Sequence, residues 1–400
     1  MSTWRNEKLS QLGEVITGTT PSTSNADYYG DDIPFATPAD LDQATPIFST
    51  ARNLSKFGAK KSRILPKGAV MVCCIGATIG KVGISGRELC TNQQINSVIF
   101  DERKVLPRYG LHACRQLGST LKAISPATTL PIVSKSKFMD LKIPVPPIAE
   151  QRKIVEVLDR TDALRAKRRE AIALLDDLAQ SIFLNLFGDT AANDQNWDDS
   201  LSLGDVAEVT SGITKGRRVS GALRLVPYMA VLNVQNKRLD LSVVKKIEAT
   251  EAEIERYRLI ENDLLLTEGG DPDKLGRGTL WRSNLPEAIH QNHIFRVRLN
   301  PGTHMDPNFL NWLLASERGR RYFLRSAKQT TGIASINATQ LRQFPLLAPP
   351  LALQRKFADQ LRKIKTHESA QRAHLAELDA LFASLQQRAF RGELWDDRGN

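Results

Sequence analysis

The sequence lacks any segment that suggests a membrane span or an export signal. Its longest predominantly apolar stretch, residues 69–79, is about half of the ~20 residues that a membrane-spanning helix requires. The N-terminal sequence MSTWRNEKLS has no basic start, apolar middle or small-residue cleavage site of a signal peptide. We therefore expect a cytoplasmic protein.

Cysteine is also scarce, and its spacing is uninformative. The chain has four cysteines, of which Cys73 and Cys74 are adjacent while Cys90 and Cys114 stand alone. This pattern indicates neither a framework of paired disulfides nor the spacing of a metal site. We expect four reduced thiols with structural roles.

Length and charge indicate more than one domain and an anionic partner. Four hundred residues exceed the ~250 at which a single hydrophobic core stops growing. Hydrophobic residues at 41% and charged residues at 25% are typical of a folded globular protein. The 55 Lys and Arg against 44 Asp and Glu give a net charge of +11. This surplus makes nucleic acid the first candidate partner.

The chain repeats itself at an offset of 203 residues. IPVPPIAEQRKI, which begins at Ile143, matches LLAPPLALQRKF, which begins at Leu346, and the register holds without a gap for more than sixty residues. Earlier segments correspond with small insertions: LGEV at Leu12 with LGDV at Leu203, Gly80-Lys81 with Gly276-Arg277, and TNQQINSV at Thr91 with HQNHIFRV at His290. The sequence therefore contains two copies of about 200 residues each.

Each copy has two parts of different composition. Its first ~147 residues contain short apolar runs broken by Gly, Pro, Asn and Asp, which predict a compact mixed α/β domain. After the prolines at 144–147 and 349–350, Ala, Leu, Glu, Gln, Lys and Arg dominate, without Gly or Pro for over thirty residues. This composition predicts two long helices.

Both predicted helices have an apolar stripe with a seven-residue repeat. Such a repeat predicts that the two helices pack together as a coiled coil. The apolar stripe positions are Ile154, Leu158, Ile172, Leu175 and Ile182 in the first helix and Phe357, Leu361, Leu375, Leu378 and Leu385 in the second.

The middle of each stripe is polar. Thr161, Arg165 and Arg168 occupy it in the first helix, and Glu368 and Gln371 in the second. Buried polar contacts there would fix the register of the pair or dock a partner, whereas a splayed, solvated section is the simpler alternative.

The positive charge belongs to the globular parts. Residues 1–147 carry a net charge of +7 and residues 203–350 a net charge of +6, whereas the helical segment 148–191 carries −1. We expect the two domains to supply the anion-binding surfaces.

The candidate motifs for nucleotide or metal binding do not have the spacing that these sites require. GATIGKVGI at Gly76 has three residues between its glycines and Val82 after its lysine, whereas a phosphate-binding loop requires four and a Ser or Thr. His290 and His293 lack a third ligand nearby, and the first copy has Thr91 and Gln94 at their positions. We expect no metal, no cofactor and no catalytic residue in this chain.

Basic and amide residues are the candidate DNA contacts. Glycine followed by a cation, in both copies, suits close approach to a phosphate, and Asn and Gln can pair with base edges. Strand-turn glycines, solvated cations and satisfied strand-edge amides remain the structural alternatives. The candidates are Lys81, Asn92, Gln93, Gln94, Lys135, Lys137, Lys215, Arg217, Arg218, Arg277, Gln291, Asn292 and His293.

Taken together, these motifs resemble the specificity subunits of type I DNA restriction-modification systems. The resemblance covers essentially the whole chain. It depends on the strand-start motifs LGEVITGTTPS and LGDVAEVTSG, the amide motif TNQQI, the helix entries IPVPPIAEQRKI and LAPPLALQRKF, and the helix ends FLNLFGD and AFRGEL.

The resemblance implies an α+β fold of two pseudo-symmetric mixed α/β target recognition domains joined by an antiparallel coiled coil of two long helices. It places the recognition domains at residues 1–147 and 201–350, the helices at 148–188 and 351–394, and a linker at 189–200. It implies a non-catalytic subunit that recognises a bipartite, asymmetric duplex DNA target, one domain for each half-site. S-adenosylmethionine, ATP and Mg would then bind partner subunits, namely two adenine methyltransferase (modification) subunits and a restriction subunit.

The second copy departs from the first in two loops. Pro272 and Asp273 lie in an inserted GGDPDKLGRG segment, and GITKGRRV replaces GTTPSTSN. Individual DNA contacts are therefore not transferable between copies. A coiled-coil interaction scaffold with basic domains and no sequence-specific DNA recognition remains the alternative function.

Overall fold

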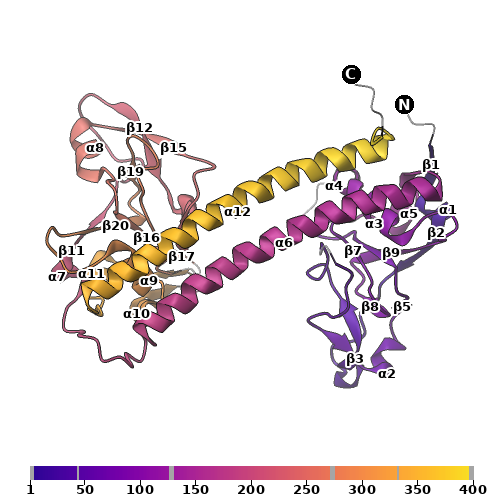
Figure 1. Cartoon of the computed structure of the whole chain (residues 1–400), viewed down its shortest axis with the longest axis horizontal. Helices are drawn as coiled ribbons and strands as arrows, with labels where there is room; N and C mark the ends of the chain where they lie inside the picture. The colour runs from indigo at the N-terminus through magenta and orange to yellow at the C-terminus, as the bar shows by residue number, and fades with distance from the viewer. Residues whose placement is uncertain (1–3, 43–44, 126–129, 271–274, 331–332, 396–400) are drawn as a thin grey trace. The chain divides into compact units, whose positions relative to one another are not determined.

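The computed structural model describes residues 4–42, 45–125, 130–270, 275–330 and 333–395 (Figure 1). The chain forms two compact units. Unit 1 comprises residues 1–172 and 370–400, and unit 2 comprises residues 173–369. Each long helix therefore contributes one half to each unit. No helix of the described residues is long and apolar enough to cross a membrane.

Unit 1 is built on an antiparallel sheet of four strands in the order β2-β9-β6-β7. A second sheet, β4-β3-β8-β5, pairs β3 and β8 in parallel, and β1 pairs with β10. The strands are β1 Arg5–Lys8, β2 Gly13–Thr17, β3 Tyr29–Ala36, β4 Asn53–Leu54, β5 Ile64–Leu65, β6 Val70–Cys73, β7 Val82–Ile84, β8 Leu89–Thr91, β9 Ile95–Phe100 and β10 Lys142–Val145.

Among the described residues of unit 1, six helical segments precede the long helix. They are α1 Leu9–Leu12, the 3-10 turn η1 Ala26–Tyr28, α2 Lys56–Ala59, α3 Pro107–Gln116, α4 Gly118–Ile124 and α5 Lys135–Met139, and they are followed by α6 Ile148–Phe187.

Strand β6 explains why the core of unit 1 has two sides. Its residues are buried on both faces, so the strand is continuously apolar rather than alternating. Val70 and Val72 join the cluster that contains α3 and the helix pair, whereas Met71 and Cys73 join a cluster on the opposite face. The sheet is thus covered by helices on one side and by the second sheet region on the other.

Unit 2 repeats this plan. Its main sheet is antiparallel with the order β11-β20-β16-β18, and its second sheet has the order β15-β12-β19, with β12 and β19 parallel. Two further sheets are β13-β14 and β17-β22-β21. The strands are β11 Ala207–Ser211, β12 Arg224–Met229, β13 Val234–Gln235, β14 Arg238–Leu239, β15 Lys245–Ala249, β16 Leu264–Thr267, β17 Gly269–Gly270, β18 Gly278–Leu280, β19 Ile289–His290, β20 Ile294–Leu299, β21 Lys328–Thr330 and β22 Ile333–Ser335.

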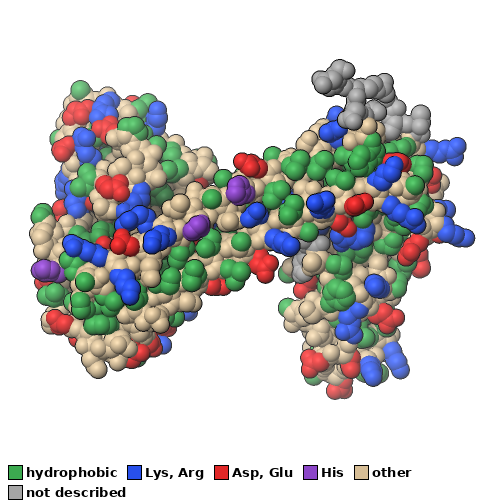
Figure 2. Space-filling model, viewed as in Figure 1, with side chains coloured by type: hydrophobic (Ala, Val, Ile, Leu, Met, Phe, Trp, Pro, Cys, Tyr) green, Lys and Arg blue, Asp and Glu red, His purple; other side chains and the backbone are tan. Residues whose placement is uncertain are grey.

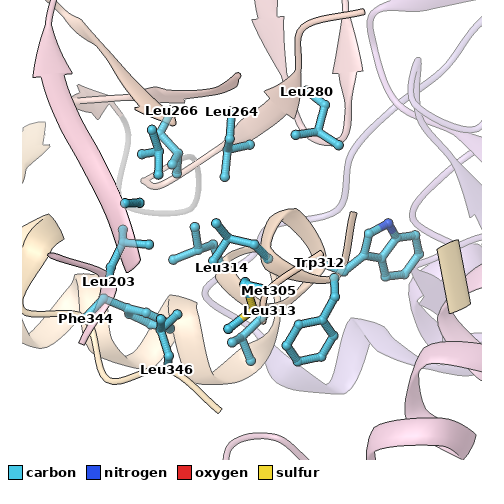
Figure 3. Close-up of a cluster of buried hydrophobic side chains, with 14 of the residues drawn as sticks. Leu203, Leu264, Leu266, Leu280, Met305, Trp312, Leu313, Leu314, Phe344 and Leu346 are labelled. Carbon is cyan, nitrogen blue, oxygen red and sulfur yellow. The ribbon is translucent and has the colours of Figure 1, made fainter. Parts of the chain in front are cut away.

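The core of unit 2 lies between its main sheet and its helices. Figure 3 shows Leu264, Leu266 and Leu280 of the sheet facing Trp312 and Leu314 of α9, all buried. The helical segments are α7 Leu203–Val206, the 3-10 turn η2 Val231–Asn233, α8 Glu251–Tyr257, α9 Pro307–Leu314, α10 Glu317–Ser326, α11 Ala338–Arg342 and the long helix α12 Leu351–Arg391.

The long helices α6 and α12 pack together in each unit (Figure 1). In unit 1, Ile154 and Leu158 share a core with Phe382 and Ala389. In unit 2, Phe183 shares a core with Phe357, Leu361 and Ile364. Early residues of one helix therefore meet late residues of the other, as in an antiparallel pair. Together with the mixed sheets, this confirms the expected fold class.

The predicted stripe positions are buried or half-buried along both helices. Ile154, Leu158, Ile172, Phe357 and Leu361 are buried, and Leu175, Ile182, Leu375, Leu378 and Leu385 are half-buried. Phe183 and Phe187, which the seven-residue register did not include, are each 1% exposed. Both helices end before a glycine with positive φ, Gly188 at 72° and Gly392 at 74°, a conformation that favours glycine at a helix C-terminus.

The polar middle of the helix pair makes specific contacts in unit 1. Arg168 Nη1 donates to Gln371 Oε1 at 2.7 Å, and Arg165 Nε donates to Asp379 Oδ1 at 2.5 Å. Thr161 donates to the carbonyl of Val157 on its own helix. In unit 2, Lys365 pairs with Glu368 at 2.6 Å. The two contacts between the helices, Arg168 with Gln371 and Arg165 with Asp379, favour polar residues that fix the register over a splayed, solvated section.

Candidate nucleic-acid interface

One end of the main sheet in unit 1 gathers the loops that contain most of its candidate residues. Because β2, β9, β6 and β7 are antiparallel neighbours, the ends of β2 and β6 and the starts of β9 and β7 lie at the same end. We call these loops, residues 18–20, 74–81 and 92–94, together with the adjoining residues 131–133, edge 1. They are joined by backbone hydrogen bonds, from Thr19 to Thr91 at 2.9 Å and from Gly76 to Pro131 at 2.9 Å.

Unit 2 has the corresponding set of loops, edge 2. It comprises residues 212–218, 268–270, 275–277 and 291–293, at the ends of β11 and β16 and the starts of β20 and β18, together with residues 334–336 at β22. The Ile213 N–H donates to the His290 carbonyl at 2.8 Å, and the Asn292 N–H donates to the Ile213 carbonyl at 3.0 Å. The inserted residues Pro272 and Asp273 lie outside the described residues.

The two edges share one backbone framework. The Cys73 N–H donates to the Lys81 carbonyl at 2.9 Å, and the Thr267 N–H donates to the Arg277 carbonyl at the same distance. Lys81 and Arg277 are therefore equivalent in three dimensions, as the sequence repeat predicted. Both side chains are half-buried, and Arg277 Nη1 donates to Gln235 Oε1 at 2.9 Å.

The glycines before these cations have a structural role. Gly80 has φ of 92° and Gly276 has φ of 69°. A Cβ at Gly80 would lie 3.1 Å from the Cα of Gly118 in α4, and one at Gly276 would lie 2.4 Å from the Phe323 ring in α10. The close approach that requires glycine is to a helix of the same unit. This contact supports the structural alternative for the two glycines, and close approach to a phosphate stays a prediction.

The amide residues differ in how free their side chains are. Asn92 Nδ2 donates to Gln94 Oε1 at 2.9 Å, and Asn92 Oδ1 accepts from the Gln94 N–H, so these two amides bind each other. Gln93 is exposed, and its Oε1 accepts from Thr20 Oγ1 at 2.5 Å. In edge 1, Gln93 is therefore the best placed of the three to reach a base.

The corresponding residues of edge 2 are Gln291, Asn292 and His293. Gln291 and Asn292 are half-buried. His293 is exposed, and its Nδ1–H donates to Glu268 Oε2 at 2.8 Å.

The remaining basic candidates fall into two groups. Lys135, Lys137, Lys215 and Arg218 are exposed, the first two on α5 next to edge 1 and the others in edge 2. Arg217 instead donates to both carboxylate oxygens of Glu253, at 2.6 and 2.7 Å, and to the Glu248 carbonyl. Its guanidinium is committed within the unit, so Arg217 is a poorer phosphate contact than its neighbours.

His290 and His293 do not share a site. His290 is fully buried, with Nδ1 3.2 Å from the Tyr257 carbonyl and Nε2 3.2 Å from the Thr210 carbonyl. Burial, reinforced by nearby Arg296, outweighs these two acceptors and lowers the pKa of His290 to about 4. Within the described ranges, no group of three His, Cys, Asp or Glu side chains is arranged to hold a metal ion. The four cysteines are buried and unpaired with one another.

Three residues that the sequence did not single out complete the edges. Thr20 positions Gln93, Gln235 accepts from Arg277, and Glu268 holds His293. The sequence could have indicated Glu268 as a site residue, because it directly follows the apolar run LLLT at the end of a strand. The roles of Thr20 and Gln235 depend on contacts between distant segments, and no sequence pattern indicates them.

Basic side chains lie on both units. In the view of Figure 2 they are interleaved with acidic side chains over each globular part, rather than gathered on a face of one sign. A mixed distribution of this kind limits the electrostatic attraction that the face in this view offers to a polyanion. Local contacts at the edges must then contribute much of any selectivity.

Comparison with known proteins supports a DNA-related family. Residues 1–174 match the family model described as a type I restriction modification DNA specificity domain. The type I restriction enzyme MjaIX specificity subunit of Methanocaldococcus jannaschii is 32% identical over 54% of this chain and 54% of that protein. The aligned stretch thus spans about half the length of this relative. The StySPI specificity subunit of Salmonella potsdam is 22% identical over 98% of this chain and 89% of its own.

A solved structure shows the same fold over nearly the whole chain. The S subunit of a type I restriction-modification system from M. genitalium superposes with a TM-score of 0.55, at 14% identity, over 97% of this chain and 96% of that one.

Proposed function

We propose that this chain, which is similar to type I restriction-modification specificity subunits over nearly its whole length, is the DNA-recognition and assembly subunit of such a complex. It catalyses no reaction itself. Residues 1–147 and 201–350 are the recognition domains, 148–188 and 351–394 are the spacer helices, and 189–200 is the linker. The subunit works in the cytoplasm on duplex DNA and recognises a bipartite, asymmetric target.

One observation supports this proposal most strongly, namely that the same sheet-end framework occurs twice with different side chains. Edge 1 exposes the amide of Gln93, whereas edge 2 exposes the imidazole of His293, which lies one position further along the repeat, at the place of Gln94. Different side chains on base edges select different bases. Two half-sites of different sequence follow from this difference. Exposed Lys135, Lys137, Lys215 and Arg218 would contact the phosphates beside them.

The helix pair is the proposed docking surface for two adenine methyltransferase subunits. Four leucines of α6 lie outside the positions of the apolar stripe and are 43–59% exposed, namely Leu164, Leu174, Leu178 and Leu184. Exposed apolar side chains repeated along one helix are typical of a surface that a partner covers. The partners would supply S-adenosylmethionine, and a restriction subunit would supply ATP and Mg chemistry. The methyltransferase would flip its target adenine out of the duplex.

DNA recognition is tested with the full chain co-purified with its modification subunit. Selection from a randomised duplex library should enrich one bipartite sequence, with binding that weakens steeply as salt rises. Replacing residues 1–147 with the equivalent domain of another family member should change one half-site and leave the other unchanged. Binding without sequence preference would contradict DNA recognition and would favour an interaction scaffold with basic domains.

Docking is tested by introducing charge on exposed positions. Leu174→Asp and Leu178→Asp together should abolish co-purification of the modification subunit, because a carboxylate in an apolar interface is costly to desolvate. Leu225→Asp is the matched control, since Leu225 is 61% exposed but lies on β12. If both variants retained the partner equally, the helix surface would not be the docking site.

A further inference from the structure

Glu268 occupies a rigidly held position in edge 2. It directly follows β16, and its N–H donates to the His293 carbonyl at 3.0 Å, while its own carbonyl accepts from the Ile336 N–H at 3.0 Å. His293 Nδ1–H donates to Glu268 Oε2 at 2.8 Å. The backbone and one carboxylate oxygen are therefore fixed. The side chain is still 34% exposed, so Oε1 remains available to a ligand.

The equivalent position in edge 1 is Cys74. Its N–H donates to the Gln94 carbonyl at 2.8 Å, and its carbonyl accepts from the Val133 N–H at 2.8 Å, which reproduces the two backbone bonds of Glu268. Cys74 is 1% exposed, and burial raises the pKa of its thiol to about 12, so this position is uncharged. The framework therefore forms without a carboxylate, and folding does not explain why Glu268 is present.

A carboxylate is an unexpected group on a surface that meets DNA. Glu268 shares edge 2 with the exposed cations Lys215 and Arg218, which attract phosphates, whereas its own charge repels them. His293 already supplies a donor to Oε2, so the carboxylate is favourable there only if Oε1 meets a further hydrogen-bond donor on the DNA. In the major groove, the exocyclic amino groups of cytosine and adenine are the donors, and Glu or Asp pairs with cytosine N4.

We infer that Glu268 is a specificity-determining residue that accepts a hydrogen bond from cytosine N4 in the half-site bound by unit 2. This inference rests on the proposed function. His293 holds the carboxylate in place for that contact. The corresponding place in edge 1 has no charged group, so the half-site bound by unit 1 lacks this contact.

The conservative change Glu268→Gln separates base recognition from a structural role. Glutamine has the same shape, but its amide presents a donor as well as an acceptor, a combination that suits adenine. At one base pair of one half-site, the preference for cytosine should fall by about tenfold or more, with adenine gaining. All other positions of the target should keep their preferences.

The experiment uses the full chain in complex with its modification subunit and a randomised duplex library. Base preferences are compared for the natural sequence, Glu268→Gln and the matched control Glu255→Gln, whose side chain is 73% exposed on α8. Thermal unfolding verifies that each variant is folded. The control should reproduce the natural preferences at every position.

Two outcomes would overturn the inference while leaving the proposed function intact. Glu268→Gln would either leave every base preference unchanged or weaken binding uniformly across sequences, as a structural residue would. If the natural sequence itself enriched no target, the proposed function would fail. The two failures are therefore distinguishable in one data set.

Discussion

In unit 1, α3 joins α6 through charged side chains, whereas in unit 2 the equivalent helix α9 joins the helix pair through aromatic rings. Asp159 Oδ1 of α6 lies 2.6 Å from Arg108 Nη2 and 2.7 Å from His112 Nε2, both of α3. At the corresponding junction of unit 2, the ring centroids of Phe187 and Phe309 lie 4.6 Å apart, and those of Trp312 and Phe357 lie 5.3 Å apart. The junction in unit 1 thus adds ion pairs to an apolar core, in which the ring centroids of Tyr109 and Phe390 lie 5.5 Å apart, whereas aromatic rings dominate the junction in unit 2.

What the two junctions share is a buried glutamine. Gln151 Oε1 accepts from the Leu106 N–H at 2.9 Å, and Gln354 Oε1 accepts from the Asp306 N–H at 2.8 Å. Each amide also donates to two backbone carbonyls of the loops before α3 or α9 and before the long helix. Buried backbone groups need partners whatever the neighbouring side chains are. This requirement explains why the repeated QRK motif survives where the surrounding contacts diverge.

The largest expected effect comes from truncating the aromatic junction. Phe357→Ala should destabilise unit 2 by about 3–5 kcal/mol, because a fully buried ring in contact with three others is lost. Hydrogen exchange of α9 against α3 would measure the loss for each unit separately. The equivalent change in unit 1, Ile154→Ala, should lower protection in α3 instead. Equal loss of protection in both helices from either variant would contradict two separate junctions.

The shared glutamines should be equally important in both copies. Gln151→Leu and Gln354→Leu each leave backbone groups buried without partners, at a cost of about 2–4 kcal/mol. Denaturant unfolding with hydrogen exchange would place each loss in its own unit. Gln116→Leu, at an exposed position of α3, is the control and should change stability by less than about 0.5 kcal/mol. A loss in one copy alone would show that the junctions differ even in this feature.

Acid should weaken unit 2 through His290. Its pKa of about 4 in the folded chain lies below the ~6.5 of an unfolded histidine, so the unfolded chain binds more protons between these values. The stability that neutral His290 contributes is present above pH ~6.5 and decreases as the pH falls, by about 2 kcal/mol at pH 5. Unfolding of the natural chain and of His290→Gln between pH 7.5 and 5 would measure this slope. An unchanged slope in the variant would assign the effect to other groups.

Much of this architecture could be predicted from the sequence because it depends on local signals. The first helix, expected over residues 148–188, is Ile148–Phe187, because proline precedes it and a glycine follows it. The equivalence of Lys81 and Arg277 followed from the repeat alone. Such features depend on residue order and not on contacts between distant segments.

The side-chain partners could not be predicted, since they depend on tertiary contacts. Arg217 appeared free in the basic sequence KGRR, yet it binds Glu253, thirty-six positions away. Phe183 and Phe187 lie outside the seven-residue register, but the domain of unit 2 covers them from a second side. The glycines Gly80 and Gly276 are required by helices α4 and α10, whose positions no sequence spacing indicates.

The smallest expected effect is a difference between the two junctions in how salt changes the stability lost on substitution. Hydrogen bonds from His112 and Arg108 outweigh burial and hold the pKa of Asp159 below its usual value, so this carboxylate is charged in the folded chain. Asp159→Asn keeps an acceptor but removes the charge, and should cost unit 1 about 1 kcal/mol at 0.05 M NaCl and less at 1 M, where charges are screened within ~3 Å. Phe309→Leu, the control in the aromatic junction, should cost the same at both salt concentrations. If the Asp159→Asn loss were also independent of salt, its charge would not be what attaches α3 to α6, and the two junctions would differ in shape alone.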